Sequence, residues 1–423
     1  MLYYSRGSVN ENLSKEDLRN GLYQALDKLG AKKKVLAIPP DITRLHSYAG
    51  KLTEMTWEYY KDNLTDILPA LGTHVPMSEK EIGIMYGSVP KSLFRVHEWR
   101  TGLETLGIVP ADYVKEISNG SVDYPIPIQV DKLLVEGKFD LILSVGQVVP
   151  HEVIGMANHN KNIFIGTGGK EGINKSHFLG AAYGMEKIMG RADTPVKRVL
   201  NYGSDHFQKG LPIVYVLTVV GKDENNNLAV RGLFIGDDIE CFNLAAELSL
   251  KVNFVMLEKP LKKVIVYLDP SEFKTTWLGN KSVYRTRMAI DDGGELIVLA
   301  PGLKEFGEDK GIDKLIRKYG YVNTPKILQL TKDNEDLQNS LSAAAHLIHG
   351  SSEGRFSITY CPGSITKEEM EGVNFKWADI KKMTERYNPE KLVDGVNIMP
   401  DGEEIFYISN PALGLWAYKE RFN

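Results

Sequence analysis

The chain has 423 residues, of which 43% are hydrophobic and 25% charged, the composition of an ordinary globular protein. Its net charge of -4 argues against a nucleic-acid-binding protein, which usually carries a basic face. Its two cysteines, Cys241 and Cys361, exclude a disulfide framework and a thiolate metal cluster.

The N-terminal sequence lacks the charged-then-apolar pattern of a signal peptide. No apolar run reaches the roughly 18 residues that are needed to span a bilayer. Together with the cysteine usage, these features predict a cytoplasmic protein with no membrane partner. The chain is too long for one hydrophobic core, so we expect two domains.

The first 150 residues alternate between helical patterns and short apolar runs. Apolar residues recur at helical spacing over 13–30 and 53–64, and Ser14 stands where an N-cap is expected. Ser78 and Glu81 form a capping-box pattern that predicts the start of another helix. Apolar runs typical of strands followed by loops cover 34–41, 65–74 and 139–151. This alternation predicts a parallel sheet with helices on its faces.

The second half of the chain begins with a different pattern and then returns to the first. Two apolar runs within 212–238 flank an Asn-rich turn, which predicts a β-hairpin, and 238–255 is predicted as a helix. From about residue 260 strands and helices alternate again. Strands are predicted at 262–270 and 355–363, a strand followed by a loop at 293–307, and a long helix at 331–350.

These patterns together predict an α/β protein with two domains and parallel or mixed sheets that carry helices on both faces. We expect an N-terminal domain over 1–258 and a C-terminal α/β domain over 259–404, with the active site between them. The last residues, 405–423, are expected to pack back on the N-terminal domain.

The segment 151–177 follows the most apolar of the predicted strands and contains three histidines and five glycines. The sequence after it has a helical pattern, so His177 is expected at the start of a helix. Ligand sites in α/β proteins lie where strands end and the chain turns. Asp41 and His74 follow other predicted strands, so we expect them near His151 at one sheet edge.

Each candidate residue also has a plainer explanation. Asp41 and Arg44 of the DITR loop suit carboxylate or phosphate binding, but a local ion pair would also close the turn. His74 and His151 are candidate proton-transfer groups or ordinary surface histidines. His177 suits a metal ligand or a histidine of a helix's first turn.

The GTGG segment, 166–169, resembles a phosphate-binding loop only weakly. Its backbone N–H groups could wrap a phosphate. It lacks both the Walker lysine pattern and the G-x-G-x-x-G spacing of dinucleotide-binding loops, so it does not by itself indicate a nucleotide.

The sequence resembles the nickel-dependent lactate racemase family of 2-hydroxyacid racemases and epimerases, most strongly over 35–180 and 285–310. His151, Lys161 and His177 stand at the family's intervals of ten and sixteen residues. The resemblance implies that Lys161 carries a nickel-pincer nucleotide (nickel pyridinium-3-thioamide-5-thiocarboxylic acid mononucleotide) through a thioamide bond, and that His177 binds the nickel.

The same resemblance implies roles for other residues. His74 and His151 match the two acid–base histidines, which exchange the hydroxyl proton while hydride leaves C2 and returns through a 2-keto acid. Asp41 and Arg44 would orient the cofactor and the substrate carboxylate. Lys304, in the segment APGLKEFG, would lie near the substrate or the cofactor phosphate. The implied partners are a small 2-hydroxy acid and the cofactor-synthesis proteins.

The chain departs from the family pattern just before Lys161. The family usually reads Ala-Gly-Phe-Ser-Gly-Gly-x-Lys, whereas this chain reads IGMANHNK, with Asn158 and His159 in place of the glycine pair. By local pattern Lys170, which follows two glycines, is the alternative attachment site.

The run 284–309 resembles the sugar-acid branch of the family and favours a D-gluconate/D-mannonate 2-epimerase over a short-chain, lactate-type racemase. Candidates for binding the additional hydroxyls are Asn201, Asp205, His206, Arg285 and Arg287. An NAD-dependent 2-hydroxyacid dehydrogenase or a zinc hydrolase is the alternative enzyme class, although its sequence fingerprints are missing. A non-catalytic binding protein would leave the strand-end histidines unexplained.

Overall fold

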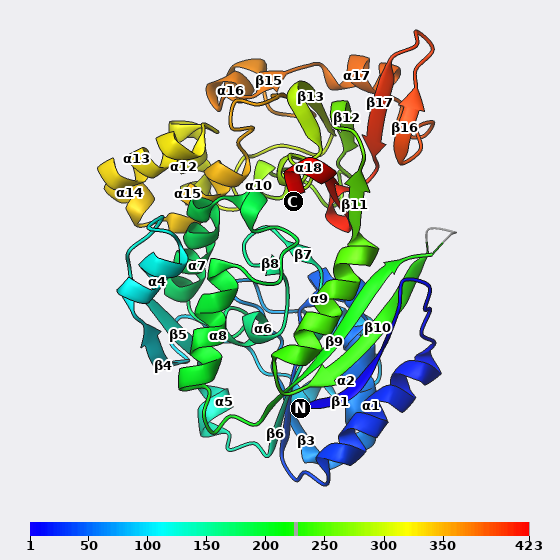
Figure 1. Cartoon of the computed structure of the whole chain (residues 1–423), viewed down its shortest axis with the longest axis vertical. Coiled ribbons are helices and arrows are strands. Elements are labelled where there is room, and N and C mark those ends of the chain that lie inside the picture. Colours follow the sequence, from blue (N-terminus) through cyan, green and yellow to red (C-terminus); the bar gives the residue numbers. More distant parts are fainter. Residues whose placement is uncertain (224–226, 423) are drawn as a thin grey trace. The chain divides into compact units, whose positions relative to one another are not determined.

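The computed structural model describes residues 1–223 and 227–422 (Figure 1). They form two compact units. The N-terminal unit consists of 1–179 and 189–253, and the C-terminal unit of 180–188 and 254–423. Residues 224–226, part of the predicted Asn-rich turn, lie outside the described residues.

The N-terminal unit is built on a six-stranded sheet with the strand order β1-β10-β9-β6-β2-β3. The four strands from β9 to β3 are parallel. At the other edge, β10 runs antiparallel to β9, and β1 runs antiparallel to β10. The strands are β1 (Leu2–Gly7), β2 (Val35–Ile38), β3 (Leu64–Ile67), β6 (Leu141–Gln147), β9 (Ile213–Lys222) and β10 (Leu228–Gly236). The predicted strands and hairpin are therefore confirmed.

The helices beside this sheet begin where the sequence supplies caps. Helix α1 (Lys15–Leu29) starts at a capping box formed by Ser14 and Asp17, and α3 (Glu79–Tyr86) at one formed by Ser78 and Glu81. Helix α2 (Ala49–Tyr60) begins four residues before the predicted start, and α9 (Ile239–Asn253) matches its prediction.

The hydrophobic core of this unit joins α1 to the sheet. Leu22 of α1 packs in one cluster with Ala37, Leu143 and Val216, and all four side chains are fully buried. Burying an aliphatic side chain of this size contributes about 1.5–3 kcal/mol. The loops that follow β2, β3 and β6 therefore begin from a well-packed sheet.

The C-terminal unit has its own six-stranded sheet, ordered β15-β14-β13-β12-β17-β16 and parallel except for β16. Its strands are β12 (Leu261–Tyr267), β13 (Ile290–Ala300), β14 (Ser357–Pro362), β15 (Lys376–Trp377), β16 (Gly395–Ile398) and β17 (Glu404–Ile408). The last strand of the chain, β18 (Leu415–Tyr418), pairs with β11 (Phe254–Leu257). The predicted α/β fold with parallel and mixed sheets is confirmed.

The long helix predicted over 331–350 is wrong. The structure has α13 (Thr324–Asp333), α14 (Glu335–Gln338) and α15 (Leu341–His349) in its place. The breaks fall at Asn334 and at Asn339 with Ser340, residues whose side chains compete for backbone hydrogen bonds and favour helix ends.

Three elements of the N-terminal unit, β4 (Leu103–Val109), β5 (Ile126–Asp131) and α8 (Pro195–Phe207), have little signal in the sequence. Strands β4 and β5 form a separate antiparallel pair, and α8 packs against both. No helix in the described part of the chain is long and apolar enough to cross a membrane.

Candidate functional site

Asp41 and His74 meet at the ends of two neighbouring strands. Asp41 follows β2, and His74 lies in the loop after β3. The His74 Nδ1 atom lies 2.8 Å from a carboxylate oxygen of Asp41. Asp41 is buried, whereas the His74 side chain is 62% exposed. The carboxylate therefore fixes Nδ1 as the protonated nitrogen and leaves Nε2 to face a ligand.

The surroundings keep the Asp41 carboxyl ionised. Burial opposes its ionisation, but hydrogen bonds from His74 and Thr43 outweigh burial and lower the pKa of Asp41 below its ordinary value. Asp41 also accepts a hydrogen bond from the Thr43 backbone N–H, which caps the turn η1 (Ile42–Ser47). An Asp–His pair of this kind is a common way to orient a general base.

Arg44 lies on the same turn but forms no ion pair with Asp41 among the described residues. Its guanidinium is exposed and donates only to the Thr43 carbonyl, at 3.3 Å. The plainer explanation of the DITR loop, a turn closed by an Asp–Arg pair, is therefore wrong. The guanidinium remains available for an anionic ligand.

His151 ends the short strand β7 (Pro150–His151), which pairs with β8 (Gly155–Met156). The Val153 N–H donates to His151 Nδ1 at 3.1 Å, and the Glu152 carboxylate lies 3.8 Å from the same atom. In this arrangement Nδ1 is unprotonated, so the neutral ring carries its proton on Nε2. His151 and His74 are thus held in opposite tautomers.

Lys161 lies in the short helix α6 (Asn160–Phe164) and is half-buried. Burial, followed by the positive charge of Arg44, lowers the pKa of Lys161 to about 8, while Glu152 and Asp41 oppose the shift. Its amine forms no hydrogen bond or ion pair within the described residues. A desolvated, unpartnered amine is a competent nucleophile near neutral pH.

The sequence predicts His177 at the start of a helix, but this prediction is wrong. His177 lies in the middle of α7 (Lys170–Tyr183). The helix begins directly after the GTGG segment. His177 Nδ1 donates to the Ile173 carbonyl at 2.7 Å, which leaves Nε2 as a free electron pair. Burial and the charge of Lys161 lower the pKa of His177 to about 4, so the ring is neutral, as a metal ligand must be.

Electrostatic interactions show which of these residues lie near one another. Lys161 interacts with Arg44, Asp41 and Glu152, and His177 interacts with Lys161 and Glu152. The sequence interpretation did not single out Glu152. Its position directly after a strand-end histidine was the available signal. Lys304 lies on an exposed loop of the C-terminal unit, where its N–H donates to the Lys274 carbonyl.

The glycines of GTGG are explained by packing within the protein. A Cβ atom on Gly166 would lie 2.3 Å from the Asn162 carbonyl oxygen, and one on Gly168 would lie 2.0 Å from that of Phe164. The Gly168 carbonyl also accepts a hydrogen bond from buried His97 at 3.0 Å. These close contacts explain why glycine is needed at these positions, so no bound phosphate has to be invoked. Lys170 follows them on the surface.

Several candidates for sugar-acid recognition are already engaged. Asn201 accepts a hydrogen bond from Asn160, and His206 stacks on Tyr202. Buried Arg287 contacts the carboxylate of Glu186 at 3.3 Å. These contacts do not by themselves define a substrate pocket.

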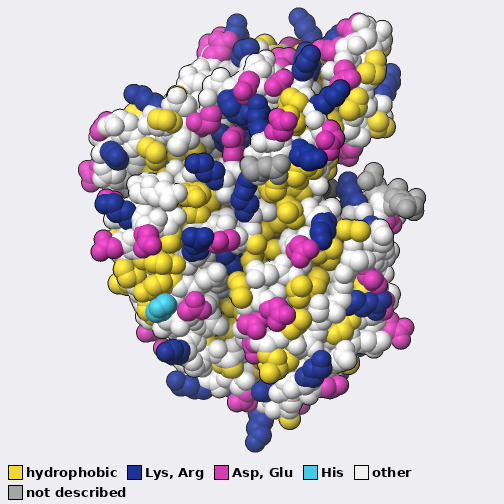
Figure 2. Space-filling view, viewed as in Figure 1, with side chains coloured by type: hydrophobic (Ala, Val, Ile, Leu, Met, Phe, Trp, Pro, Cys, Tyr) yellow, Lys and Arg dark blue, Asp and Glu magenta, His cyan; other side chains and the backbone are white. Residues whose placement is uncertain are grey.

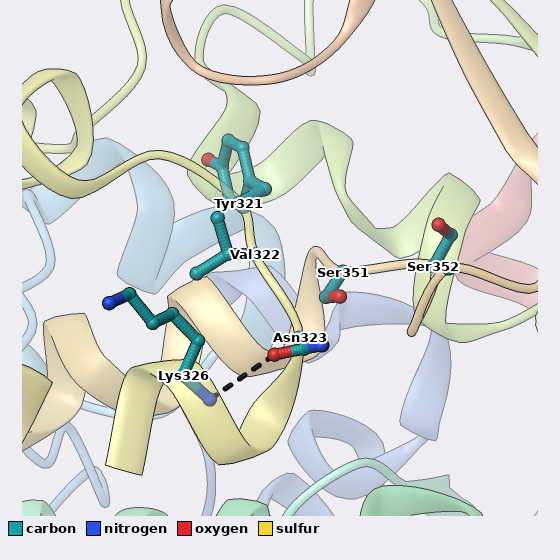
Figure 3. A pocket seen from close by; sticks show the side chains of 7 residues that line it. Tyr321, Val322, Asn323, Lys326, Ser351 and Ser352 are labelled. Atoms are coloured by element: carbon teal, nitrogen blue, oxygen red, sulfur yellow. Dashed lines mark hydrogen bonds between the residues drawn. The ribbon is translucent and has the colours of Figure 1, made fainter. Parts of the chain in front are cut away.

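A pocket of about 520 Å³ lies in the C-terminal unit and contains none of the predicted site residues (Figure 3). Lys326 at the start of α13 and Ser351 and Ser352 after α15 are among the residues that line it. The Lys326 N–H donates to the Asn323 side chain at 3.2 Å, so this helix end is capped by the protein itself.

The described residues contain no group of three or more His, Cys, Asp or Glu side chains arranged to hold a metal ion. A metal bound at His177 would therefore take its other donors from a bound group. The viewed face of the molecule shows acidic and basic side chains interspersed (Figure 2).

Comparisons with known proteins relate the chain to one family model and to two solved structures. Residues 9–187 match the family model described as the lactate racemase N-terminal domain. A protein from Thermotoga maritima of known structure is 24% identical, with a TM-score of 0.81 over 97% of this chain and 99% of its own. The lactate racemase apoprotein from Thermoanaerobacterium thermosaccharolyticum is 17% identical, with a TM-score of 0.69 over 98% of this chain and 94% of its own.

At these identities the two structures show a shared fold only. No curated protein matches the chain. The family model rests on the sequence itself and covers the strands and loops that carry Asp41, His74, His151, Lys161 and His177. Over residues 9–187, the chain is thus similar to the lactate racemase N-terminal domain.

Proposed function

We propose that this protein is a nickel-dependent racemase or epimerase that inverts C2 of a 2-hydroxy acid. The observation that carries the proposal is the set of side chains that His74, Lys161 and His177 supply in the N-terminal unit. An oriented histidine, an unpartnered amine and a neutral histidine with an available Nε2 all belong to the N-terminal unit. The family match supports an isomerase of the racemase or epimerase type.

The residues fit a nickel-pincer nucleotide. The Lys161 amine is available to form a thioamide bond, and His177 offers one neutral nitrogen to a metal whose remaining donors the nucleotide would supply. When bound, this group would supply a hydride acceptor and donor for C2 of the substrate.

The protein's own residues handle the proton and the carboxylate. His74 Nε2, with Nδ1–H held by Asp41, can take the hydroxyl proton of one stereoisomer. His151 serves the other stereoisomer, whose hydroxyl lies on the opposite side. The exposed guanidinium of Arg44 binds the substrate carboxylate. It also holds the planar keto acid in the site until its other face is presented for hydride return. Lys304 is proposed to assist Arg44.

For the substrate we propose a sugar acid, as in a D-gluconate/D-mannonate 2-epimerase, because the run 284–309 is similar to that branch. A lactate-type racemase is the second candidate, and the lactate racemase domain match favours it. The two differ in the hydroxyls that the site must bind beyond C2.

A panel of 2-hydroxy acids from lactate to gluconate tests both candidates. Protein made together with the cofactor-synthesis proteins should contain nickel, and it should act more slowly on substrate deuterated at C2. Inversion of gluconate without inversion of lactate supports the sugar-acid enzyme, and the reverse supports the racemase. Activity with added NAD alone, in protein made without nickel, would contradict the proposed function.

A further inference from the structure

The backbone just before Lys161 adopts a conformation that glycine favours, although no glycine is there. Asn158 has φ 69°, and His159 has φ 59° with ψ -134°. Side chains with a Cβ atom are sterically disfavoured in this region, and most strongly at His159. Such a conformation persists only when the surrounding structure imposes it.

The His159 side chain is held on every side. Its ring packs against Tyr215 at a centroid distance of 3.9 Å and an interplanar angle of 38°, and it lies 5.2 Å from the ring of Phe242. Its Nε2–H donates to the Asp238 carbonyl at 3.2 Å, and its Nδ1 accepts from the amine of Lys197 at 3.1 Å. The strained residue is therefore fixed through its side chain.

Lys197, on α8, is 1% exposed and meets no carboxylate in the described part of the chain. Its amine donates to His159 and, at 2.7 Å, to the Asn160 side chain, and it lies 3.7 Å from the centre of the Phe242 ring. Burial lowers the pKa of Lys197 well below its ordinary value. A buried amine without a counter-ion is costly, so its contacts are specific and close.

The residues on both sides of Lys161 are anchored as well. Asn160 donates to the Asn201 side chain at 2.8 Å. Asn162 donates to the Ile38 carbonyl at 2.9 Å and to the Ser144 hydroxyl at 3.0 Å. Lys161 is therefore the one residue of 158–162 whose side-chain polar group forms no hydrogen bond with a described residue. Its neighbours hold the backbone in place, and the Lys161 amine projects from that fixed backbone.

We propose that Lys197 is a positioning residue for Lys161. By holding His159 and Asn160, it fixes the direction in which the Lys161 amine meets an electrophilic cofactor. This inference rests on the proposed attachment of a cofactor at Lys161. The contacts between His159 and Lys197 would stabilise a backbone conformation that a glycine pair adopts without such contacts.

The test uses Lys197→Met, which removes the amine and keeps the length, with Lys209→Met as an exposed control on the chain after α8. The readout is the pH dependence of Lys161 acylation by acetic anhydride in the protein without cofactor, followed by peptide mass spectrometry. In the unsubstituted protein the acylation rate should rise through an inflection near pH 8.

Release of the segment should let the Lys161 amine reach solvent and return toward ordinary lysine behaviour. In Lys197→Met we expect the inflection to rise by about one pH unit, so that acylation at pH 8 slows by about fivefold, because the neutral fraction of the amine falls from about one half to about one tenth. Lys209→Met should leave it unchanged. Loss of stability alone would lower the unfolding temperature without moving this inflection in the folded protein.

A second variant covers the case in which Lys197→Met does not fold. His159→Gly suits the backbone conformation at that position and removes the ring through which Lys197 acts. It should give the same rise of the inflection. If either folded variant retains the unsubstituted protein's inflection, Lys197 does not position Lys161.

The cofactor-loaded protein separates this inference from the proposed function. Intact mass should show an adduct on Lys161 in the unsubstituted protein and at least about a tenfold smaller adduct fraction in His159→Gly, because attachment depends on orientation. An unsubstituted protein without any adduct contradicts the proposed function, while the acylation profiles still decide the role of Lys197.

Discussion

The region around His74 and the region around Lys161 are built in opposite ways. His74 is largely exposed and depends on one buried carboxylate for its orientation. The residues beside Lys161 are buried, and each is held by several contacts. A group that exchanges protons with substrate needs access and one orienting contact, whereas a group that carries a cofactor needs a fixed backbone. The comparison predicts how substitutions in the two regions differ.

Loss of the attachment lysine is expected to have the largest effect. Lys161→Ala should reduce activity of the nickel-loaded protein by about 10⁴-fold or more, because it removes the nucleophile that binds the cofactor. Intact mass should show no adduct. Exposed Lys170 gives the matched substitution, Lys170→Ala, and an adduct that survives in Lys161→Ala but is lost in Lys170→Ala would reverse the assignment.

The two histidines should have the next largest effect. His74→Ala and His151→Ala are each expected to lower kcat by about 10²–10⁴-fold, the usual contribution of general acid–base catalysis. Circular dichroism should show a folded protein in both, since neither ring belongs to the core. Full activity in one variant would remove that histidine from the mechanism.

Asp41→Asn leaves His74 in place but removes the charge that orients it. We expect kcat to fall by about 10²-fold, the scale of a misplaced catalytic group. Activity assays across pH would measure the change. An unchanged kcat would mean that the dyad does not orient the base.

The same variant has a consequence for stability. The pKa of Asp41 is lowered in the folded protein, so the carboxylate contributes stability above its ordinary pKa of 3.8 that is lost as pH falls through the lowered value. The free energy of unfolding should therefore fall more steeply below about pH 4 in the unsubstituted protein than in Asp41→Asn. Urea unfolding at several pH values would show the difference.

The smallest effect is expected from a substitution that alters packing alone. Gly146→Ala would place a Cβ atom 1.8 Å from the Asn158 side-chain nitrogen, and we expect it to lower the free energy of unfolding by about 1–3 kcal/mol. Adding Asn158→Gly should restore part of this loss. Gly83→Ala, which meets no atom within 4 Å, is the control, and an equal loss there would contradict the contact.

The sequence predicted the fold where local signals were strong. The capping boxes at Ser14 and Ser78 and the apolar run of β6 reappear in the structure because local preference and burial agree there. The helix that carries His177 began earlier than predicted. Gly172 and Asn174 weaken the helical pattern, yet packing keeps that turn helical.

The site was predictable as a set of residues but not as a set of contacts. Spacing and strand ends indicated Asp41, His74 and Lys161. The bond between Asp41 and His74 joins residues 33 positions apart, and that between His159 and Lys197 joins residues 38 apart. Such contacts depend on how elements pack, so no local pattern in one sequence reveals them.

The short segment 180–188 belongs to the C-terminal unit, although residues of the N-terminal unit precede and follow it. Its Glu186 carboxylate contacts Arg287, which is 3% exposed, and also Arg355 at 3.2 Å. A fragment beginning at residue 254 would retain both guanidinium groups without that carboxylate, and buried Arg287 would keep only the more distant Glu353 carboxylate, at 3.7 Å. The C-terminal unit is therefore not a module that one cut or one genetic crossover could transfer, and any exchange between relatives has to carry 180–188 with it.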